Sequence, residues 1–395
     1  MQIKKVMKGL FMNRRVIINL VIVTFFFLLI NFYLGIHGWI YINTILKHEI
    51  HTVSKLIYWS IFWLFTFAYI LSRVLKKHLP RPIFKFLHHI GAYLLAVIYY
   101  LIFILLISDL IGWLLLTFTP LSSEKLIISL GTIVLLTIVF LIVKGRRNAL
   151  NTQFIHYDIH VEKSNLHSKA LSIVLVSDLH LSTLVTNKRL AFLIDEINKL
   201  SPDLVLIAGD IIDEDITPFV EENMVETFKK LKPSIGTYAV PGNHDYYGGH
   251  LDLLVDHLND AGIHILLDEK ELVENSFYIV GRKDLVSKNR LELHDLLKDI
   301  DHTKPIILLD HQPYRLDIPT NLGVDLQVSG HTHRGQFKPN HLITRKLYEL
   351  DWGYLQKNLS HFVVSSGFGT WGPPIRTGNP SEIVTINVTF QESSN

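Results

Sequence analysis

Side chains that can bind a divalent metal follow five apolar runs after residue 170, each where a run ends. The clusters are Asp178-Leu179-His180, Gly209-Asp210, Gly242-Asn243-His244-Asp245, Asp310-His311 and Gly330-His331-Thr332-His333. Carboxylate, amide and imidazole ligands without thiolates suit a borderline metal such as Mn, Fe or Zn. The chain has no cysteine, which excludes disulfides, Cys-ligated zinc and thiol catalysis.

The clusters hold more ligands than a single ion can take. The side chains that qualify are Asp178, His180, Asp210, Asn243, His311, His331 and His333. Two ions about 3.5–4 Å apart, bridged by one carboxylate, would use all of them. The sequence therefore predicts a centre for two divalent metal ions.

Short apolar strands and amphipathic helices must position these ligands. The strands expected directly before the clusters are Leu171–Val176, Leu204–Ala208, Thr237–Val240, Ile306–Leu309 and Leu326–Val328. The other expected elements are helices at Asn187–Leu200, Val225–Leu231, Leu251–Ala261 and Leu291–Ile300, and strands at Ile263–Leu267, Glu271–Val273, Phe277–Val280, Phe362–Ser365 and Ile383–Thr389. This alternation indicates an α/β layered domain. Because the carboxyl ends of strands in an open α/β sheet form one crevice, the five clusters should converge there.

The first part of the chain has a different character. Of all 395 residues, 49% are hydrophobic and only 19% are charged. Four apolar runs are long enough, or nearly so, to cross about 30 Å of hydrocarbon: Val16–Ile42, Leu56–Leu75, Ile90–Phe118 and Leu126–Val143. We therefore expect a transmembrane region with four spans in residues 1–150 and a metal-binding domain in residues 151–395. The entry to that domain, with His156, His160 and His167, is expected to be a solvated linker.

Charge is divided unevenly between these two parts. Residues 1–144 contain 14 of the 38 Lys and Arg residues but only three of the 36 Asp and Glu residues, which gives them a net charge of +11. The remaining residues contain 24 Lys and Arg and 33 Asp and Glu, which gives them a net charge of −9. An acidic second part argues against a nucleic-acid partner. Basic residues gather before the first run, between the second and third, and after the fourth, and such segments favour the cytoplasmic side. The sequence predicts a multi-pass protein of the cell membrane with its metal-binding domain in the cytoplasm.

The order D-x-H, G-D, G-N-H-D, H and G-H-x-H resembles the calcineurin-like metallophosphoesterase superfamily over about Leu171 to Ile386. The tail Gly367–Ile386, with spans in front, resembles its membrane-anchored bacterial branch. That branch includes phosphodiesterases of the YaeI and YkuE type and relatives assigned to UDP-2,3-diacylglucosamine hydrolysis. The resemblance implies a four-layer α/β/β/α fold, in which two sheets pack face to face between helices and a di-metal centre lies at one edge.

Carried over residue by residue, the resemblance implies two ligand sets that share one bridging carboxylate, Asp210. One metal would take Asp178, His180, Asp210 and His333, and the other would take Asp210, Asn243, His311 and His331. His244 matches the family's non-ligand histidine near the scissile phosphate, and Asp245 would orient its ring. Two basic residues are candidates for a phosphate contact: Arg376, and Arg334, which stands where relatives often carry glycine.

The expected function is that of a membrane-anchored, di-metal-dependent phosphoesterase. Two cations lower the pKa of a bound water, so that hydroxide exists near neutral pH, and they align phosphorus for in-line attack. His244 can donate a proton or a hydrogen bond to an oxygen of the substrate. Monoester, phosphodiester and pyrophosphate substrates all remain open, and the spans favour lipid-linked ones such as UDP-2,3-diacylglucosamine. The alternative is a catalytically weak membrane-tethered binding or regulatory module.

Overall fold

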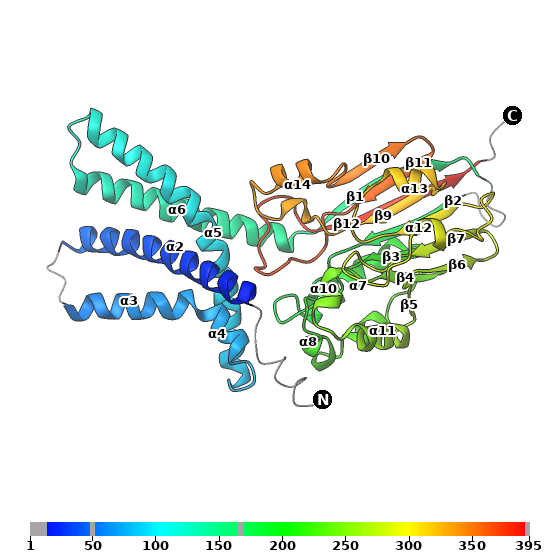
Figure 1. The fold of residues 1–395 in the computed structure, drawn as a ribbon, viewed down its shortest axis with the longest axis horizontal. Helices are drawn as coiled ribbons and strands as arrows, with labels where there is room; N and C mark the ends of the chain where they lie inside the picture. The colour runs from blue at the N-terminus through cyan, green and yellow to red at the C-terminus, as the bar shows by residue number, and fades with distance from the viewer. Residues whose placement is uncertain (1–13, 48–51, 164–169, 392–395) are drawn as a thin grey trace. The chain divides into compact units, whose positions relative to one another are not determined.

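The structure, a computed structural model, describes residues 14–47, 52–163 and 170–391 (Figure 1). The chain divides into two compact units, Met1–Ile142 and Val143–Asn395, and each is described by itself. The basic residues Lys4, Lys5 and Lys8, on which part of the predicted orientation depends, lie outside the described residues, as does His167.

The first unit is built from apolar helices. They are α2 (Arg14–Leu46), α3 (Thr52–Thr66), α4 (Ala68–Val74), α5 (Arg81–Phe118) and most of α6 (Ser123–Leu150). Three helices, α2, α5 and α6, are long and apolar enough to cross a membrane, and α3 and α4 form a pair bent by 54°. The described part of the chain thus offers three candidate spans, or four if the bent pair is one span.

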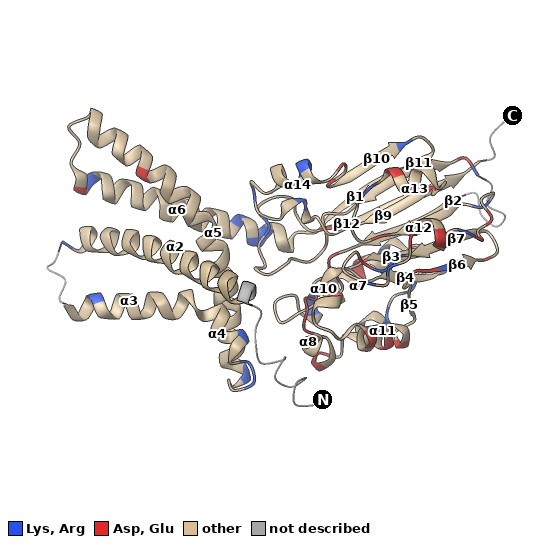
Figure 2. Cartoon of the chain, viewed as in Figure 1, with Lys and Arg blue, Asp and Glu red and all other residues tan. Residues whose placement is uncertain are grey.

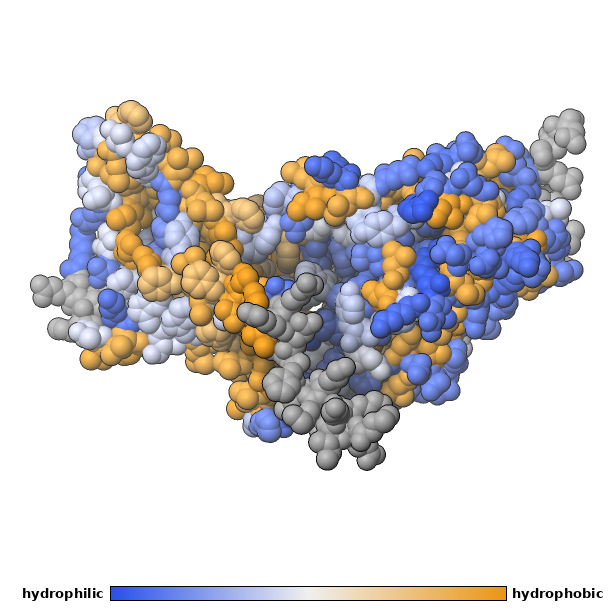
Figure 3. All heavy atoms as spheres, in the orientation of Figure 1, coloured by the Kyte–Doolittle hydropathy of each residue, from blue (hydrophilic) through white to orange (hydrophobic). Residues whose placement is uncertain are grey.

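The helices of this unit turn apolar side chains outward. Leu34, Leu105 and Val134 pack together where α2, α5 and α6 meet, whereas most of the large apolar side chains on these helices are exposed. Figure 3 shows this apolar surface in orange, and Figure 2 shows Lys and Arg mainly near the helix ends. Asp109 on α5 is partnered inside the unit, because it accepts a 2.6 Å hydrogen bond from the Tyr33 hydroxyl. A surface of this kind is suited to lipid as its solvent.

The second unit contains two six-stranded sheets. The first has the order β1 (Gln153–Val161), β12 (Glu382–Phe390), β2 (Ala170–Val176), β3 (Leu204–Ala208), β4 (Gly236–Val240) and β5 (Ile263–Ile265). The second has the order β10 (Gly353–Lys357), β11 (Ser360–Val364), β9 (Leu326–Ser329), β8 (Ile306–Leu309), β7 (Phe277–Gly281) and β6 (Glu269–Val273). Because β2, β3 and β4 run parallel in one sheet and β8 and β9 in the other, each group ends on one edge of its sheet.

The core of this unit lies in three layers of apolar contact. Side chains of both sheets, such as Leu206 on β3 and Val328 on β9, form one buried cluster between them. A second cluster packs α7 (Asn187–Leu200), α9 (Met224–Phe228) and α11 (Leu251–Asp260) on the outer face of the first sheet, and a third packs α12 (Leu293–Leu296) on the second sheet. The predicted four-layer α/β/β/α architecture is therefore confirmed.

Five short helices and one predicted linker complete the unit. The helices are α8 (Thr217–Glu221), α10 (Asn243–Tyr247), α13 (Asp317–Asn321), α14 (His341–Leu347) and the 3₁₀ turn η1 (His333–Gly335). The stretch expected to be a linker is instead the edge strand β1, which pairs in parallel with β12 from Gln153 to Val161, and His156 and His160 on it are exposed, as expected. Its apolar residues alternate with polar ones, so one face of the strand meets the core while His156 and His160 bond to side chains of β12.

Candidate metal centre

The loops after five strands bring the predicted ligands together at one edge of the two sheets. β2 leads into Asp178 and His180, and β3 leads into Asp210. These two loops are joined by backbone hydrogen bonds, since the amide of Asp178 donates to Gly209 at 2.9 Å and that of His180 donates to Asp210 at 3.0 Å. The loops after β8 and β9 are joined in the same way, through the amide of Gly330 and the carbonyl of His311 at 2.9 Å.

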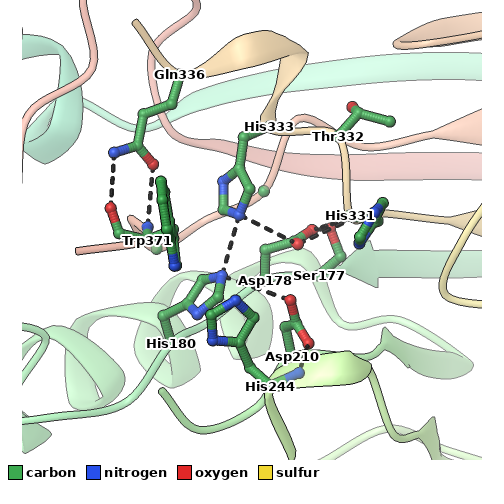
Figure 4. Close-up of polar contacts among 12 residues, drawn as sticks. Ser177, Asp178, His180, Asp210, His244, His331, Thr332, His333, Gln336 and Trp371 are labelled. Atoms are coloured by element: carbon green, nitrogen blue, oxygen red, sulfur yellow. Dashed lines mark hydrogen bonds and ion pairs between the residues drawn. The ribbon is translucent and has the colours of Figure 1, made fainter. Parts of the chain in front are cut away.

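One group of ligand atoms gathers around two histidines that face each other (Figure 4). The Nε2 atoms of His180 and His333 are 3.0 Å apart. Asp178 Oδ1 lies 3.4 Å from His333 Nε2, and Asp210 Oδ2 lies 3.7 Å from His180 Nε2. All four side chains are buried. This is the set that the family resemblance implies for the first metal.

A second group gathers on the other side of Asp210. His311 Nε2 lies 3.3 Å from Asp210 Oδ2, and His331 Nδ1 lies 2.9 Å from Asn243 Oδ1. Asp210, His311 and His331 each offer a ligand atom within 4.8 Å of the others. Asp210 thus belongs to the second group and also lies 3.7 Å from His180 of the first, which is where a bridging ligand would have to stand.

The tautomer of His311 shows what this second group is suited to hold. Its Nδ1 lies 2.7 Å from the carbonyl oxygen of Ala208, and a carbonyl can only accept, so Nδ1 carries a proton. In the neutral ring, Nε2 then presents a lone pair to the Asp210 carboxylate. This buried Nε2 has no hydrogen-bond partner among the described residues. Two acceptors that face each other in a buried site need a cation or a proton between them, and a divalent metal fits that need.

The pKa values of the predicted ligands reflect their burial and their closeness to one another. Burial raises the pKa of Asp178. Burial also lowers the pKa of His333 well below its ordinary value and that of His331 to about 3, which keeps both rings neutral and able to ligate. The pKa of His311 is raised well above its ordinary value: burial acts to lower it, but the carboxylate of Asp210 outweighs that effect. Without a metal, His311 therefore keeps a proton toward Asp210, and a divalent ion bound there would displace that proton.

The backbone at this edge is held in an uncommon conformation. Five of the predicted ligands have a positive φ: Asp178 (51°), His180 (46°), Asp210 (51°), His331 (72°) and His333 (46°). For residues with a side chain this left-handed region costs about 1–2 kcal/mol each. Such strain persists at sites whose geometry is fixed by the surroundings, and it concentrates at functional sites.

Two glycines allow the loops to approach the carboxylates. A Cβ on Gly242 would lie 2.2 Å from Asp210 Oδ1, and a Cβ on Gly330 would lie 2.3 Å from Asp178 Oδ2. Both distances are far below van der Waals contact, so any other residue would displace the carboxylate. The amide of the next residue, His331, donates to Asp178 Oδ1 at 3.0 Å.

The structure corrects the predicted role of Asp245. Its carboxylate is fully buried and accepts hydrogen bonds from three backbone amides, those of Gly242 (2.8 Å), Ile212 (2.9 Å) and Ile211 (3.2 Å). Asp245 thus ties the loop after β4 to the loop after β3, and the prediction that it orients the His244 ring is wrong.

The carboxylate that faces the His244 ring belongs to Asp213, which the sequence analysis missed. Asp213 Oδ1 lies 3.2 Å from His244 Nδ1 and 3.4 Å from His180 Nδ1, so one carboxylate positions both rings. Burial raises its pKa, but the two histidines outweigh that effect and hold the pKa of Asp213 below its usual range. The one sequence feature that could have identified Asp213 is its position three residues after the predicted ligand Asp210.

The two arginines considered for a phosphate contact are committed elsewhere. Arg376 is fully buried and donates to backbone carbonyls, including that of Gly369 at 2.7 Å and that of Gly367 at 3.0 Å. The guanidinium of Arg334 lies 4.1 Å from the centroid of the Trp352 ring and donates to Asn379 at 2.8 Å. Both side chains shape the loops of the site, and the buried guanidinium of Arg376 is not placed to meet a phosphate.

Aromatic side chains border the centre on the side of His244. The Trp371 ring lies 6.4 Å and the Tyr247 ring 5.3 Å from the His244 ring, measured between centroids, and both aromatic side chains are exposed. The Gln336 amide fixes the backbone of Trp371 with two hydrogen bonds of 2.9 and 3.0 Å (Figure 4). This rim can contact an apolar or planar part of a substrate.

Comparison with known proteins identifies the family to which this chain belongs. Residues 171–335 match the calcineurin-like phosphoesterase family. A Campylobacter jejuni protein named an uncharacterized metallophosphoesterase is 36% identical over 272 residues, which cover 67% of this chain and 70% of that protein. Bacillus subtilis YkuE, named likewise, is 30% identical over 257 residues, which cover 62% of this chain and 89% of that protein. The chain therefore belongs to the calcineurin-like phosphoesterase family, and the predicted resemblance is confirmed.

Other relatives are matched over a smaller part of their length. An uncharacterized metallophosphoesterase of Helicobacter pylori (strain J99) is 33% identical over 226 residues, 56% of this chain. The chain spans 60% of the length of that relative.

The close approach of Gly330 to Asp178 makes a direct prediction. Gly330→Ala should reduce the metal content of the purified chain, because the new methyl group displaces the Asp178 carboxylate. The matched control is Gly236→Ala on β4, where a Cβ would meet only Tyr238 at an ordinary 3.4 Å. Elemental analysis by mass spectrometry measures both variants. Equal metal content in Gly330→Ala and the unmodified chain would show that Asp178 is not a ligand.

Proposed function

We propose that the chain is a membrane-anchored phosphoesterase that uses two divalent ions, Mn, Fe or Zn, to hydrolyse phosphodiester or pyrophosphate bonds. One ion would be held by Asp178, His180, Asp210 and His333, and the other by Asp210, Asn243, His311 and His331. Bound there, the ions would supply an activated water and polarise the phosphoryl group. Family membership supports the reaction class, and the donor set supports the metals.

One observation carries this proposal: ligand atoms from both sheets face each other at the shared carboxylate of Asp210. His311 Nε2 and His180 Nε2 lie 3.3 and 3.7 Å from the same oxygen, Asp210 Oδ2. A carboxylate placed between two sets of nitrogen ligands is the geometry that two neighbouring cations require.

His244 is the residue we assign to proton donation at the substrate. Its backbone amide donates to Asp210 Oδ1 at 2.9 Å, which fixes the residue beside the bridging ligand. Asp213 faces Nδ1 at 3.2 Å, so Nε2 is left for a phosphate oxygen or the leaving oxygen. A group positioned in this way contributes typically 10²–10⁴-fold to the rate. We assign Asp213 as the residue that positions His244, in place of Asp245.

We propose lipid-linked phosphate or pyrophosphate compounds as the substrate class, of which UDP-2,3-diacylglucosamine is one. The three or four candidate spans favour a site that works close to a membrane, and the Trp371–Tyr247 rim suits an apolar neighbour of the phosphate. Screening hydrolysis of lipid pyrophosphates and a generic aryl phosphodiester by the purified full chain tests this assignment.

Replacing the bridging carboxylate tests the two-metal assignment. Asp210→Asn should abolish hydrolysis of an aryl phosphodiester and lower the metal content, because a neutral amide with one ligand oxygen cannot hold two cations together. The control is Asp195→Asn on α7, outside the centre. Near-normal turnover with two metals bound per chain would contradict the assignment.

Removing the proposed acid separates binding from chemistry. His244→Ala should keep both metals but lose about 10²–10⁴-fold in kcat, the range typical of a positioned proton donor. Asp213→Asn should share part of this loss and shift the pH profile, because it no longer holds the His244 ring. If the metal content of His244→Ala collapses instead, His244 is a ligand and its assigned role is wrong.

The proposed orientation depends on how often the chain crosses the membrane. We propose that α3 and α4 together form one span, so that four crossings place residues after 144 in the cytoplasm. The basic residues Arg73, Lys76, Lys77, Arg81 and Lys85 on one connection, and Lys144, Arg146 and Arg147 after α6's apolar run, favour this side. Three crossings would keep these two basic segments together but place both on the side opposite to the basic N-terminal residues, such as Arg14 and Arg15.

A reporter fused after Asn395 measures this orientation. A fluorescent protein that matures only in the cytoplasm should be bright, and alkaline phosphatase at the same position should be inactive. Active alkaline phosphatase with a dark fluorescent fusion would place the metal centre outside the cytoplasm and overturn the proposed location.

A further inference from the structure

A second pocket lies within the Val143–Asn395 unit, where the end of α6, the start of α7 and the segment Phe368–Pro374 meet. Its volume is about 390 Å³. None of the predicted metal ligands is among the described residues that line it. The pocket is therefore a separate feature from the metal centre.

Three basic side chains line this pocket: Arg146 from α6 and Lys188 and Arg189 from α7. Among the described residues, the acceptors of Arg189 are all neutral: the carbonyls of Leu150 (3.0 Å) and Ala149 (3.3 Å) and the Thr152 hydroxyl (2.8 Å). Within the described ranges, no Asp or Glu lies at ion-pair distance from any of the three. The pocket thus concentrates positive charge that the described part of the protein leaves uncompensated.

Two further observations support an anionic ligand. Burial, together with the nearby guanidinium of Arg146, lowers the pKa of Arg189 to about 10, so like charges crowd one another there. Thr370 also lines the pocket, is only 4% exposed, and has a hydroxyl with no hydrogen-bond partner among the described residues. A buried hydroxyl without a partner is costly unless a ligand completes it.

The remaining walls of the pocket are apolar. Leu150 and Phe192 line it and are 48% and 39% exposed. The Phe368 ring lies beneath the Arg189 guanidinium, 4.0 Å from it. A ligand that fills this pocket should therefore carry both an anionic group and an apolar part.

The position of the pocket along α6 indicates where that ligand resides. α6 is one continuous helix, and its apolar run ends at Val143. Arg146 and Ala149 follow three and six residues later, which at 1.5 Å per residue is about 4.5–9 Å beyond the apolar end. If α6 crosses the membrane, this is the depth of the lipid headgroups.

We propose that this pocket binds an anionic glycerophospholipid. The headgroup phosphate meets Arg146, Lys188 and Arg189 and completes the Thr370 hydroxyl, and the glycerol and upper acyl chain lie against Leu150 and Phe192. The inference rests on α6 as a membrane span and not on the phosphoesterase activity. It also explains why a domain with a net charge of −9 keeps an uncompensated basic pocket at this place.

The test uses the full chain purified in a neutral detergent. Dioleoyl phosphatidylglycerol is titrated into the chain and into Arg146→Gln/Lys188→Gln, and bound lipid is counted by native mass spectrometry. Loss of one direct charge-assisted hydrogen bond to the phosphate weakens binding roughly tenfold, about 1.4 kcal/mol. The double variant should therefore bind roughly 100-fold more weakly, and Thr370→Val, which keeps every charge, should bind several-fold more weakly.

Matched controls separate this pocket from general surface charge. Lys144→Gln/Arg147→Gln removes the same charge from the same helix at residues that do not line the pocket, and it should bind phosphatidylglycerol as the unmodified chain does. Dioleoyl phosphatidylcholine should bind weakly to every variant. The thermal unfolding midpoint of each variant, within a few degrees of the unmodified chain, verifies the fold.

Three results would overturn the inference. They are equal loss of binding in both double variants, equal affinity for phosphatidylcholine and phosphatidylglycerol, and displacement of the lipid by an equimolar amount of sn-glycerol 3-phosphate. The last would identify a soluble phosphate compound as the ligand. Hydrolysis plays no part in the readout, so failure here is distinguishable from failure of the proposed phosphoesterase function.

Discussion

In the second unit, buried nitrogen and oxygen lone pairs face one another at the shared edge of the two sheets. Only a cation or a proton between them removes their mutual repulsion. His311 Nε2 faces Asp210, and the Nε2 atoms of His180 and His333 face each other at 3.0 Å. In a buried site such atoms repel unless something positive lies between them. Divalent ions of the kind that the family uses would satisfy this constraint, and the surrounding architecture keeps the ligands in place.

That architecture holds the ligands through the backbone more than through side chains. Parallel strands end at one edge of each sheet, and amide-to-carbonyl bonds join neighbouring loops, as between Asp178 and Gly209. Asp245 accepts three amides and so joins the loops after β3 and β4. These interactions offset the left-handed φ angles of five ligands, because a loop tied at several points cannot relax to an unstrained conformation.

The sequence predicted what depends on local pattern and missed what depends on packing. β3 and α7 agree with their expected bounds, because an apolar strand and an amphipathic helix are both periodic signals. The alternation of Ile155, Tyr157, Ile159 and Val161 was also such a signal, but the histidines between them suggested a solvated linker. Asp245 directly follows His244 in the sequence and was therefore expected to face its ring, whereas Asp213 is distant in sequence and reaches the ring only through packing. The backbone of the short helix α10 determines which of these two carboxylates faces the His244 ring.

We infer that the chain binds two divalent ions and needs them to hydrolyse phosphoesters. Elemental analysis of the purified full chain is combined with an aryl phosphodiester assay before chelation, after it, and after metal is restored. We expect two ions per chain, loss of hydrolysis when both are removed, and recovery when Mn, Fe or Zn is added. Hydrolysis that continues unchanged in the metal-free chain would contradict it.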